Sequence, residues 1–441
     1  MTEASCCAMS HAENLPASQN AIGPSIEITS RDSTHTKSEM IDQALAMLVR
    51  YCRSQSWSGY DPYDGLKSPV ARSFFFNNKF ARTALTQLIK RSPVNLRPIL
   101  GIKKAINPKG AAVSARAIML LADREAVDLP GEVNEGSAYQ PGGLEADFRF
   151  LISSLASLRN PNYQEACWGY DFDWQSRAFF APKGTPNVVC TVFAGHAYLD
   201  WYERTGNEPV LLMATSSCRF LLDRLNRTED SSGDCFSYTP LDHSRVHNVN
   251  LLAAEFLART FAKTGIDEYR VAAERAARFT VEKQRRDGSW FYGEAESQAW
   301  IDSFHTGFVL VSLKNLIEYL GRASEWRAAL DRGYQFYEKR FFLADGRPGY
   351  YHDRRYPHDV HSAAQGVITF VELTDLMPNA KSMASRVVRW AIKELQDPAG
   401  FFYFQKHSLY TNKTPYIRWA QAWMLYALSL YLSRKWVSEN V

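Results

Sequence analysis

A long-period repeat of apolar segments, rich in alanine and glycine, is the feature that most constrains the fold. The six segments are NPKGAAVSARAIMLLAD from Asn107, NVVCTVFAGHAYLDWYERTG from Asn187, HNVNLLAAEFLARTFAKTG from His247, FHTGFVLVSLKNLIEYLG from Phe304, VHSAAQGVITFVELTDLM from Val360 and YIRWAQAWMLYALSLYL from Tyr416. The last four start 57, 56 and 56 residues apart, and the earlier steps of 80 and 60 residues indicate insertions. Such a period is typical of a repeat architecture. Segments that are apolar on nearly every side are typical of buried helices.

Six amphipathic segments alternate with these buried ones. They cover residues 39–55, 145–160, 208–225, 267–284, 325–341 and 379–396. In DEYRVAAERAARFTVEKQ, for example, Tyr269, Ala272 and Ala276 fall on one side and charges on the other, which indicates a helix with one exposed face. The sequence therefore predicts an all-α fold, an (α/α)6 toroid with six outer and six inner helices. We expect a single toroid domain over residues 39–441.

The first 38 residues differ in composition from the rest of the chain. They are polar and rich in Ser, Thr and Asn, and they lack the continuous apolar core of a secretory signal. We interpret residues 1–38 as a disordered tail in which Cys6 and Cys7 are incidental thiols. A cytoplasmic protein is the expectation that follows.

Composition excludes several classes of function. The formal charge of +4 comes without a long Lys/Arg run, so nucleic acid is not an expected partner. No run of about 18 apolar residues predicts an integral membrane segment. The seven cysteines are scattered, with neither a CxxC pair nor metal-ligand spacing. We therefore expect reduced thiols, no metal and no cofactor.

The loops that lead from outer to inner helices repeat a pattern of their own. They read SWSGYDPYDG, CWGYDFDW, GDCFSYTP, DGSWFYGE, DGRPGYYH and PAGFFYFQ, and each joins a Gly or Asp turn to aromatic residues. These loops are candidates for short hairpins. In a toroid they all lie at the end where the inner helices begin, so we expect an aromatic-lined bowl there.

The candidate functional residues lie at the starts of the inner helices and in these loops. The candidate catalytic residues are Asp302, His305, Asp359 and His361. The candidate substrate-binding residues are Asp171, Asp173, Trp174, Asn187, His247, Asn250, Trp290, Tyr292, Tyr351, Gln365, Lys413 and Arg418. Aromatic faces for stacking, together with groups that bind hydroxyls, suit a sugar ring. Helix N-termini favour an anionic ligand, which would also give Lys413 and Arg418 a use.

Each candidate also has a structural interpretation. Asp302 and Asp359 precede helices and are suited to N-capping. Asp171 and Asp173 suit turns. His247 is compatible with a hydrogen-bonded core position, and Arg418 with a structural ion pair. Because an Asp and a His recur at the same position one period apart, we favour a functional role for these pairs.

Two chemistries fit these residues, and the sequence leaves both open. One is glycoside hydrolysis by two carboxyls, such as Asp302 with Asp359 or Asp173. The other is proton abstraction beside a sugar carboxylate, with His305, His361, Tyr351 and Arg418 as candidates. A glycan-binding scaffold without catalysis, which uses only aromatic stacking, is the alternative from another class.

The helix pattern and loops resemble the (α/α)6-toroid carbohydrate enzymes, including N-acylglucosamine epimerases, unsaturated glucuronyl hydrolases and uronyl epimerases. The motifs GYDPYDGL, WGYDFDWQSR, IDSFHTGF, DVHSAAQG and TPYIRWAQAWM are similar to α-toroid proteins of bacterial exopolysaccharide and surface-polysaccharide biosynthesis clusters. This resemblance implies a carbohydrate substrate, a role in making a cell-surface glycan and possible association with a polysaccharide synthesis complex. QRRDGSW resembles a triterpene cyclase repeat, but DFDW lacks the Asp-x-Asp-Asp acid, which disfavours terpenoid chemistry.

Overall fold

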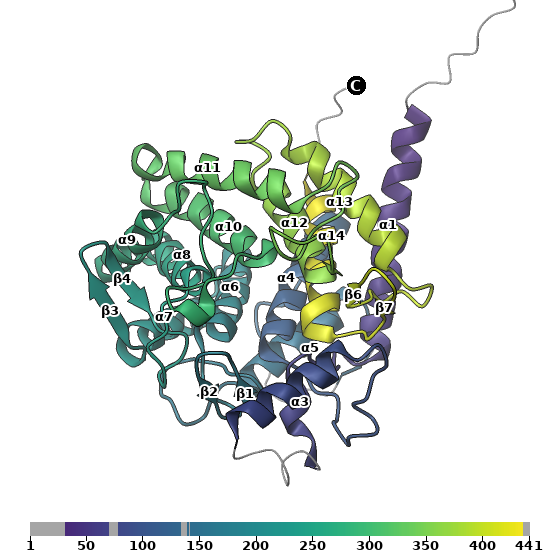
Figure 1. Cartoon of the computed structure of the whole chain (residues 1–441), viewed down its shortest axis with the longest axis horizontal. Helices are drawn as coiled ribbons and strands as arrows, with labels where there is room; N and C mark the ends of the chain where they lie inside the picture. Colours follow the sequence, from purple (N-terminus) through teal and green to yellow (C-terminus); the bar gives the residue numbers. More distant parts are fainter. Residues whose placement is uncertain (1–30, 70–77, 134–138, 141, 435–441) are drawn as a thin grey trace, which may run out of the picture.

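Two concentric rings of helices build the molecule in the computed structural model, which describes residues 31–69, 78–133, 139–140 and 142–434 (Figure 1). The outer helices are α1 (Arg31–Ser54), α5 (Leu144–Ser157), α7 (Glu208–Arg224), α9 (Asp267–Glu282), α11 (Ala323–Phe341) and α13 (Ala380–Leu395). The inner helices are α4 (Pro108–Glu125), α6 (Val188–Thr205), α8 (His247–Thr264), α10 (Ser303–Leu320), α12 (Val360–Glu372) and α14 (Ala422–Ser433). A π-helical turn, η3 (Ile417–Gln421), leads into α14.

The inner ring is closed. Each inner helix packs against the next along the chain, and α14 packs against α4 to complete the circle. Each inner helix also packs against an outer one: α4 with α5, α6 with α7, α8 with α9, α10 with α11, α12 with α13, and α14 with α1. The predicted all-α (α/α)6 toroid is therefore confirmed.

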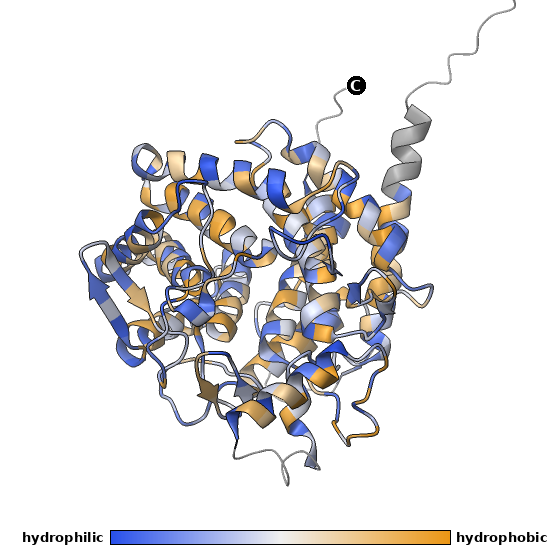
Figure 2. Cartoon of the chain, in the orientation of Figure 1, coloured by the Kyte–Doolittle hydropathy of each residue, from blue (hydrophilic) through white to orange (hydrophobic). Residues whose placement is uncertain are grey.

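Sequence chemistry explains where the inner helices start and stop. Asn107, Asn187, Asp302 and Asp359 accept backbone N–H groups in the first turns of α4, α6, α10 and α12, as N-cap residues do. Three of the inner helices, α6, α8 and α10, end at a glycine with positive φ, for example Gly206 after α6 (φ 64°). Between these signals the inner helices are almost wholly buried, and apolar residues recur along the helices of both rings (Figure 2).

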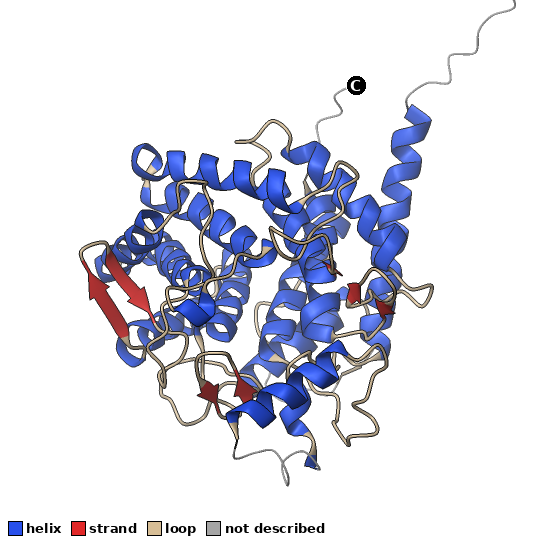
Figure 3. Cartoon of the chain, in the orientation of Figure 1, coloured by secondary structure: helices blue, strands red, loops and turns tan. Residues whose placement is uncertain are grey.

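Short strands occur only in the connecting loops of the described chain (Figure 3). The antiparallel pairs are β1 (Trp174–Gln175) with β2 (Phe180–Ala181), and β3 (Arg227–Asp230) with β4 (Gly233–Phe236). A three-stranded sheet joins β5 (His358–Asp359), β6 (Gln405–Lys406) and β7 (Thr411–Asn412), with Asp359 opposite Gln405. Two 3₁₀ turns, η1 (Asp64–Lys67) and η2 (Glu296–Gln298), complete the loops.

The first repeat contains a helix that the sequence pattern did not predict. Helix α3 (Lys79–Arg91) lies between α1 and α4 and contacts η1 and β1. Only Thr86 and Ile89 of α3 are buried, so it lacks the apolar periodicity that marks the other helices. It supplies one wall of the pocket described below.

The start of α1 differs from the expected boundary of the tail. The helix begins at Arg31 rather than near residue 39. Residues 1–30, with Cys6 and Cys7, lie outside the described residues. No helix in the described ranges combines the length and the apolar character needed to cross a bilayer.

Candidate functional site

A pocket of about 650 Å³ opens at the end of the toroid where inner helices begin. Its floor includes Lys109 of α4, His305 of α10, His361 of α12 and Arg418 of η3. Each of these residues lies in the first turns of its helix, so the partial positive charge of several helix N-termini is directed at the same space. The pocket is therefore suited to a negatively charged or strongly polar ligand.

Asp302 and His305 form a hydrogen-bonded pair at this floor. Asp302 Oδ1 accepts the backbone N–H of His305 at 3.0 Å, and Asp302 Oδ2 contacts His305 Nδ1 at 2.7 Å. Trp300 Nε1 donates a further bond to Oδ2 at 2.8 Å. The Asp302 side chain is 1% exposed and that of His305 is 23% exposed. A carboxylate that accepts from Nδ1–H leaves Nε2 as the ring nitrogen able to take a proton.

His361 is held differently. Its backbone N–H is bonded to Asp359 Oδ1 at 2.8 Å, but its ring Nδ1 lies 3.1 Å from the carbonyl oxygen of Trp419. A carbonyl only accepts, so Nδ1 carries the proton and Nε2 is an acceptor. That Nε2 is buried and has no hydrogen-bond partner among the described residues. Burial, with Lys109 and Arg418 nearby, holds the pKa of His361 well below its usual range, so the ring is neutral.

Asp359 does not line the pocket. Its carboxylate accepts hydrogen bonds from Gln405 Nε2 at 2.6 Å and from Trp419 Nε1 at 3.1 Å, besides the His361 N–H. The residue is fully buried, and burial raises its pKa to about 6. Asp359 therefore holds β5, β6 and η3 together around the start of α12.

Aromatic rings form the walls of the pocket. Tyr292 and Trp300 are stacked, with centroids 4.3 Å apart, and Tyr292 lies 4.5 Å from the His305 ring. On another wall Trp174 packs against Tyr238 at 5.0 Å. Tyr351 also lines the pocket, and burial raises its pKa, so its phenol keeps its proton and acts as a hydrogen-bond donor. These faces and donors suit a sugar ring.

The charges that line the pocket are strongly asymmetric. Among the described lining residues, the cationic side chains are Lys90, Arg91, Lys109, Arg177, Arg354 and Arg418, and the one carboxylate is Asp302. Arg418 forms an ion pair with Asp61 behind the wall. Arg177 lies over the Trp300 ring at 4.4 Å, and Lys90 lies over Tyr63 at the same distance. The remaining positive charge favours an anionic ligand.

Lys109 is a pocket residue that the sequence analysis did not single out. Its Nζ lies 4.7 to 5.3 Å from the rings of Phe193, Phe308 and Trp423, which come from three other inner helices. The residue is 5% exposed, and burial lowers its pKa to about 7. The available signal was a lysine at the second position of a helix whose other residues up to Ala115 are all small or apolar.

Seven of the sixteen predicted residues line the pocket. They are Asp302, His305, His361, Trp174, Tyr292, Tyr351 and Arg418. The other nine lie outside its lining: Asp359, Asp171, Asp173, Asn187, His247, Asn250, Trp290, Gln365 and Lys413. The toroid thus brings together predicted residues from the second, fourth and fifth repeats and from η3, which leads into α14.

Several residues outside the lining have structural partners. Asn250 Nδ2 donates to the Ala276 carbonyl at 2.8 Å, which ties α8 to α9, and Trp290 Nε1 donates to the Thr280 carbonyl at 2.8 Å, which ties the loop after α9 to the same helix. His247 Nε2 lies 2.8 Å from Glu294 Oε1.

The remaining residues outside the lining have local roles in helices and loops. Asn187 caps α6, and Gln365 Nε2 donates to Thr369 one turn further along α12. Asp171 forms an ion pair with Lys67 at 2.6 Å, and Asp173 accepts the backbone N–H of Lys183 at 2.7 Å. Lys413 lies over the Tyr403 ring at 5.0 Å.

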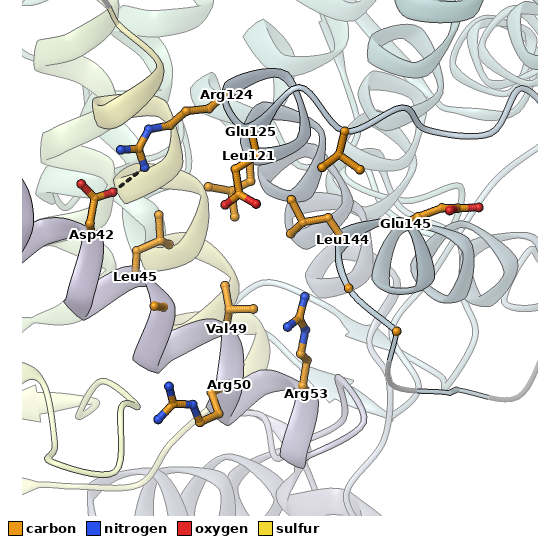
Figure 4. A pocket seen from close by; sticks show the side chains of 14 residues that line it. Asp42, Leu45, Val49, Arg50, Arg53, Leu121, Arg124, Glu125, Leu144 and Glu145 are labelled. Atoms are coloured by element: carbon orange, nitrogen blue, oxygen red, sulfur yellow. Dashed lines mark hydrogen bonds and ion pairs between the residues drawn. The ribbon is translucent and has the colours of Figure 1, made fainter.

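A second hollow of about 650 Å³ lies on the flank of the molecule, between α1, the end of α4 and the start of α5 (Figure 4). None of the predicted site residues lines it. Its charges are largely paired: Arg124 bonds to Asp42, and Arg53 bonds to Asp147 at 2.6 Å. Within the described ranges, no group of three or more His, Cys, Asp or Glu side chains is placed to hold a metal ion.

Comparisons with known proteins reveal likeness in structure. No family model and no curated protein sequence matches the chain. A GH76 α-mannanase from Bacteroides thetaiotaomicron superimposes with a TM-score of 0.55 at 13% identity, covering 74% of this chain and 85% of that one. A cellobiose 2-epimerase from Bacillus thermoamylovorans gives 0.58 at 10% identity, covering 74% and 87%.

A third solved structure covers more of the chain. An unsaturated glucuronyl hydrolase specific for heparin gives a TM-score of 0.55 at 13% identity, covering 90% of this chain and 96% of that one. These neighbours are toroid enzymes that act on carbohydrates, and the low identities show likeness of fold alone. The chain thus has the (α/α)6 toroid fold of these solved enzymes.

Proposed function

We propose that the chain is a carbohydrate-active enzyme that moves a proton on the ring of an anionic sugar, as a uronyl epimerase or lyase does. The observation that carries the proposal is the 2.7 Å contact of His305 Nδ1 with Asp302, at the floor of a pocket whose other charged lining groups are cations. His305 is the base, and Asp302 fixes its tautomer and stabilises the imidazolium.

The proposed reaction begins with removal of the proton on the carbon beside the sugar carboxylate. His305 Nε2 takes that proton, and the electron pair spreads into the carboxylate as an enediolate. Arg418 and the other lining cations stabilise the added negative charge. Return of a proton to the opposite face, from Tyr351, gives an epimer. Departure of the substituent on the next carbon instead gives an unsaturated sugar.

Glycoside hydrolysis is the second candidate, favoured by the hydrolases among the structural neighbours. Most glycosidases use two carboxyl groups on either side of the bond that breaks. Asp302 is the one carboxylate among the described residues that line the pocket, since Asp359 and Asp173 lie outside the lining. The charge pattern therefore supports proton transfer over hydrolysis.

The proposal includes a setting and a non-catalytic alternative. The setting is the tailoring of an exopolysaccharide or other cell-surface glycan precursor in the cytoplasm, beside a polysaccharide synthesis complex. It is supported by the sequence motifs that resemble proteins of such clusters. A glycan-binding scaffold needs the aromatic walls but has no use for a histidine oriented by a buried carboxylate, so the Asp302–His305 pair favours the enzyme.

Incubation in deuterated water with uronic-acid and neutral oligosaccharides tests the proposal. NMR and mass spectrometry should detect deuterium in the ring of a uronic acid, with an intact chain for an epimerase or an unsaturated end for a lyase. New reducing ends without ring deuterium would establish the hydrolase instead. Saturable binding without any chemical change would establish the scaffold.

A further inference from the structure

The deepest part of the pocket contains an unusual set of polar groups. Lys109 is 5% exposed and forms no ion pair with any described residue. The rings of Phe193, Phe308 and Trp423, from α6, α10 and α14, lie 4.7 to 5.3 Å from its Nζ. Lysines are seldom buried unless they are paired. A buried cation facing a cavity without a carboxylate partner indicates that a ligand supplies the anion.

Two buried acceptors without partners belong to residues that line the same cavity. His361 Nε2 is buried, is 1% exposed as a residue, and has no partner in the described part of the chain. The Oδ1 atom of Asn248, which also lines the pocket, is likewise buried and unpartnered. Buried polar groups are hydrogen-bonded in native proteins, so these acceptors call for donors from a ligand. Hydroxyl groups provide such donors.

We propose that Lys109 and His361 form a subsite at the pocket floor that binds the carboxylate of a uronic acid and the hydroxyl next to it. The Lys109 ammonium donates to the carboxylate, and the hydroxyl donates to His361 Nε2. This inference rests on the proposed function, because it places the carboxylate of the same substrate whose ring carbon faces His305. A neutral sugar would leave the ammonium without an anion.

The groups around Lys109 make the subsite sensitive to pH. Arg418 of η3 lowers the pKa of Lys109, and His361 of α12 is a further basic neighbour. Cys190 of α6 and Asp61 of the first loop act in the opposite direction, and their effects are smaller. Burial, followed by Arg418, lowers the pKa of Lys109 to about 7. A bound carboxylate favours the ammonium, so binding above that pH must be accompanied by proton uptake.

Calorimetry with wild-type protein provides a test that needs no variant. Titration of a methyl glucuronide at pH 8 in two buffers of different ionisation enthalpy should reveal uptake approaching one proton. The same titration at pH 5.5 should reveal little uptake, because Lys109 is already protonated. Binding of the glucuronide at pH 8 without proton uptake overturns the proposal.

Substitution of Lys109 gives the second test. Lys109→Met fits the aromatic cage, and it should weaken glucuronide binding about 10- to 100-fold, as expected when a hydrogen bond between charged groups is lost. Binding of the matching methyl glucoside should change little. Lys413→Met is the control, because Lys413 lies outside the pocket lining. An unchanged preference for glucuronide over glucoside in Lys109→Met contradicts the subsite. The subsite is also contradicted if the wild type binds glucose 6-phosphate as tightly as it binds the methyl glucuronide.

The two proposals fail in different ways. Ring deuterium exchange in the wild type, combined with an unchanged glucuronide preference in Lys109→Met, would overturn the subsite and leave the proposed function standing. Loss of glucuronide binding in Lys109→Met, with no exchange on any uronic acid in the wild type, would support the subsite and overturn the proton-transfer reaction.

Discussion

Two consecutive repeats place an aspartate and a histidine at the start of an inner helix, yet the two pairs differ in geometry. Asp302 precedes His305 by three residues, and Asp359 precedes His361 by two. Both carboxylates cap their helix through the backbone N–H of the histidine. Only Asp302 also contacts the ring of its histidine.

The spacing explains the difference. At three residues, the side chain of His305 turns back over the capping carboxylate, so one residue serves the helix and the ring. At two residues the His361 ring does not reach the capping carboxylate, and its Nδ1 is bonded to the Trp419 carbonyl instead. The Asp359 carboxylate accepts hydrogen bonds from the Gln405 and Trp419 side chains. A shared capping pattern therefore predicts a helix start in both repeats but an oriented histidine in only one.

Replacement of His305 should produce the largest effect on rate. His305→Gln removes the proposed base, and deuterium incorporation into the uronic acid ring should fall roughly 100- to 10,000-fold. The melting temperature should stay close to that of the wild type, because the ring is not part of the core. His352→Gln, which changes a histidine outside the pocket lining, should leave the rate intact. Full activity of the His305→Gln variant would show that the Asp302–His305 pair takes no part in the reaction.

Matched asparagine substitutions compare the two aspartates directly. Asp302→Asn retains an acceptor for the α10 cap but loses the charge beside His305, so the rate should fall about 10- to 100-fold, as for loss of a charged hydrogen bond. Asp359→Asn should leave the rate much closer to wild type. The deuterium exchange rates of the two variants, measured under the same conditions, test this comparison. Equal losses of rate would show that the two Asp–His pairs do not differ in function.

Asp359 should instead affect stability, and with a defined pH dependence. Burial raises its pKa from 3.8 to about 6. A carboxyl with a raised folded-state pKa stabilises the protein fully below about pH 4, and this contribution is lost as pH rises through 6. The rise corresponds to roughly 3 kcal/mol. The asparagine of Asp359→Asn does not ionise. The free energy of unfolding of this variant, relative to that of the wild type, should therefore increase from pH 4.5 to pH 7.5. Urea denaturation of both proteins at both pH values measures this difference in free energy of unfolding. A difference that does not change with pH would refute the prediction.

Asp171 provides the reference with the smallest effect. Its ion pair with Lys67 is partly exposed, with side chains 18% and 21% accessible, and such pairs contribute at most about 1 kcal/mol. Asp171→Asn should therefore change the free energy of unfolding by no more than that amount and leave the rate unchanged. A large loss of activity would instead place this loop in contact with the substrate.

The fold could be predicted from the sequence because its causes are local and repeated. Four of the six inner helices carry their own capping side chain, all six are largely apolar, and the last four recur every 56 to 57 residues. Helix α3 could not be predicted, because only two of its residues are buried. Its position depends on packing against η1 and β1 rather than on a pattern within the helix.

The candidate site could be predicted only in part. The sequence placed Asp302 and His305 together because the helix brings them together. It did not place Lys109 in the pocket, since the cage around Nζ is built from α6, α10 and α14, which are distant along the chain. It also did not separate Asp359 from the pocket, because its partners Gln405 and Trp419 lie 46 and 60 residues further along the chain.

The contact between Arg418 and Asp61 has a consequence for the timing of synthesis. These residues lie 357 positions apart, and their ion pair holds η3 against the loop that follows α1. At translation rates of about 5–20 residues per second, the ribosome needs roughly 20 to 70 seconds to make the second partner after the first. During that interval the face of α4 that packs against α14 in the complete protein is uncovered. A nascent chain therefore exposes apolar surface of α4 until its last repeat emerges, which makes the C-terminal repeat the step at which the ring of helices becomes complete.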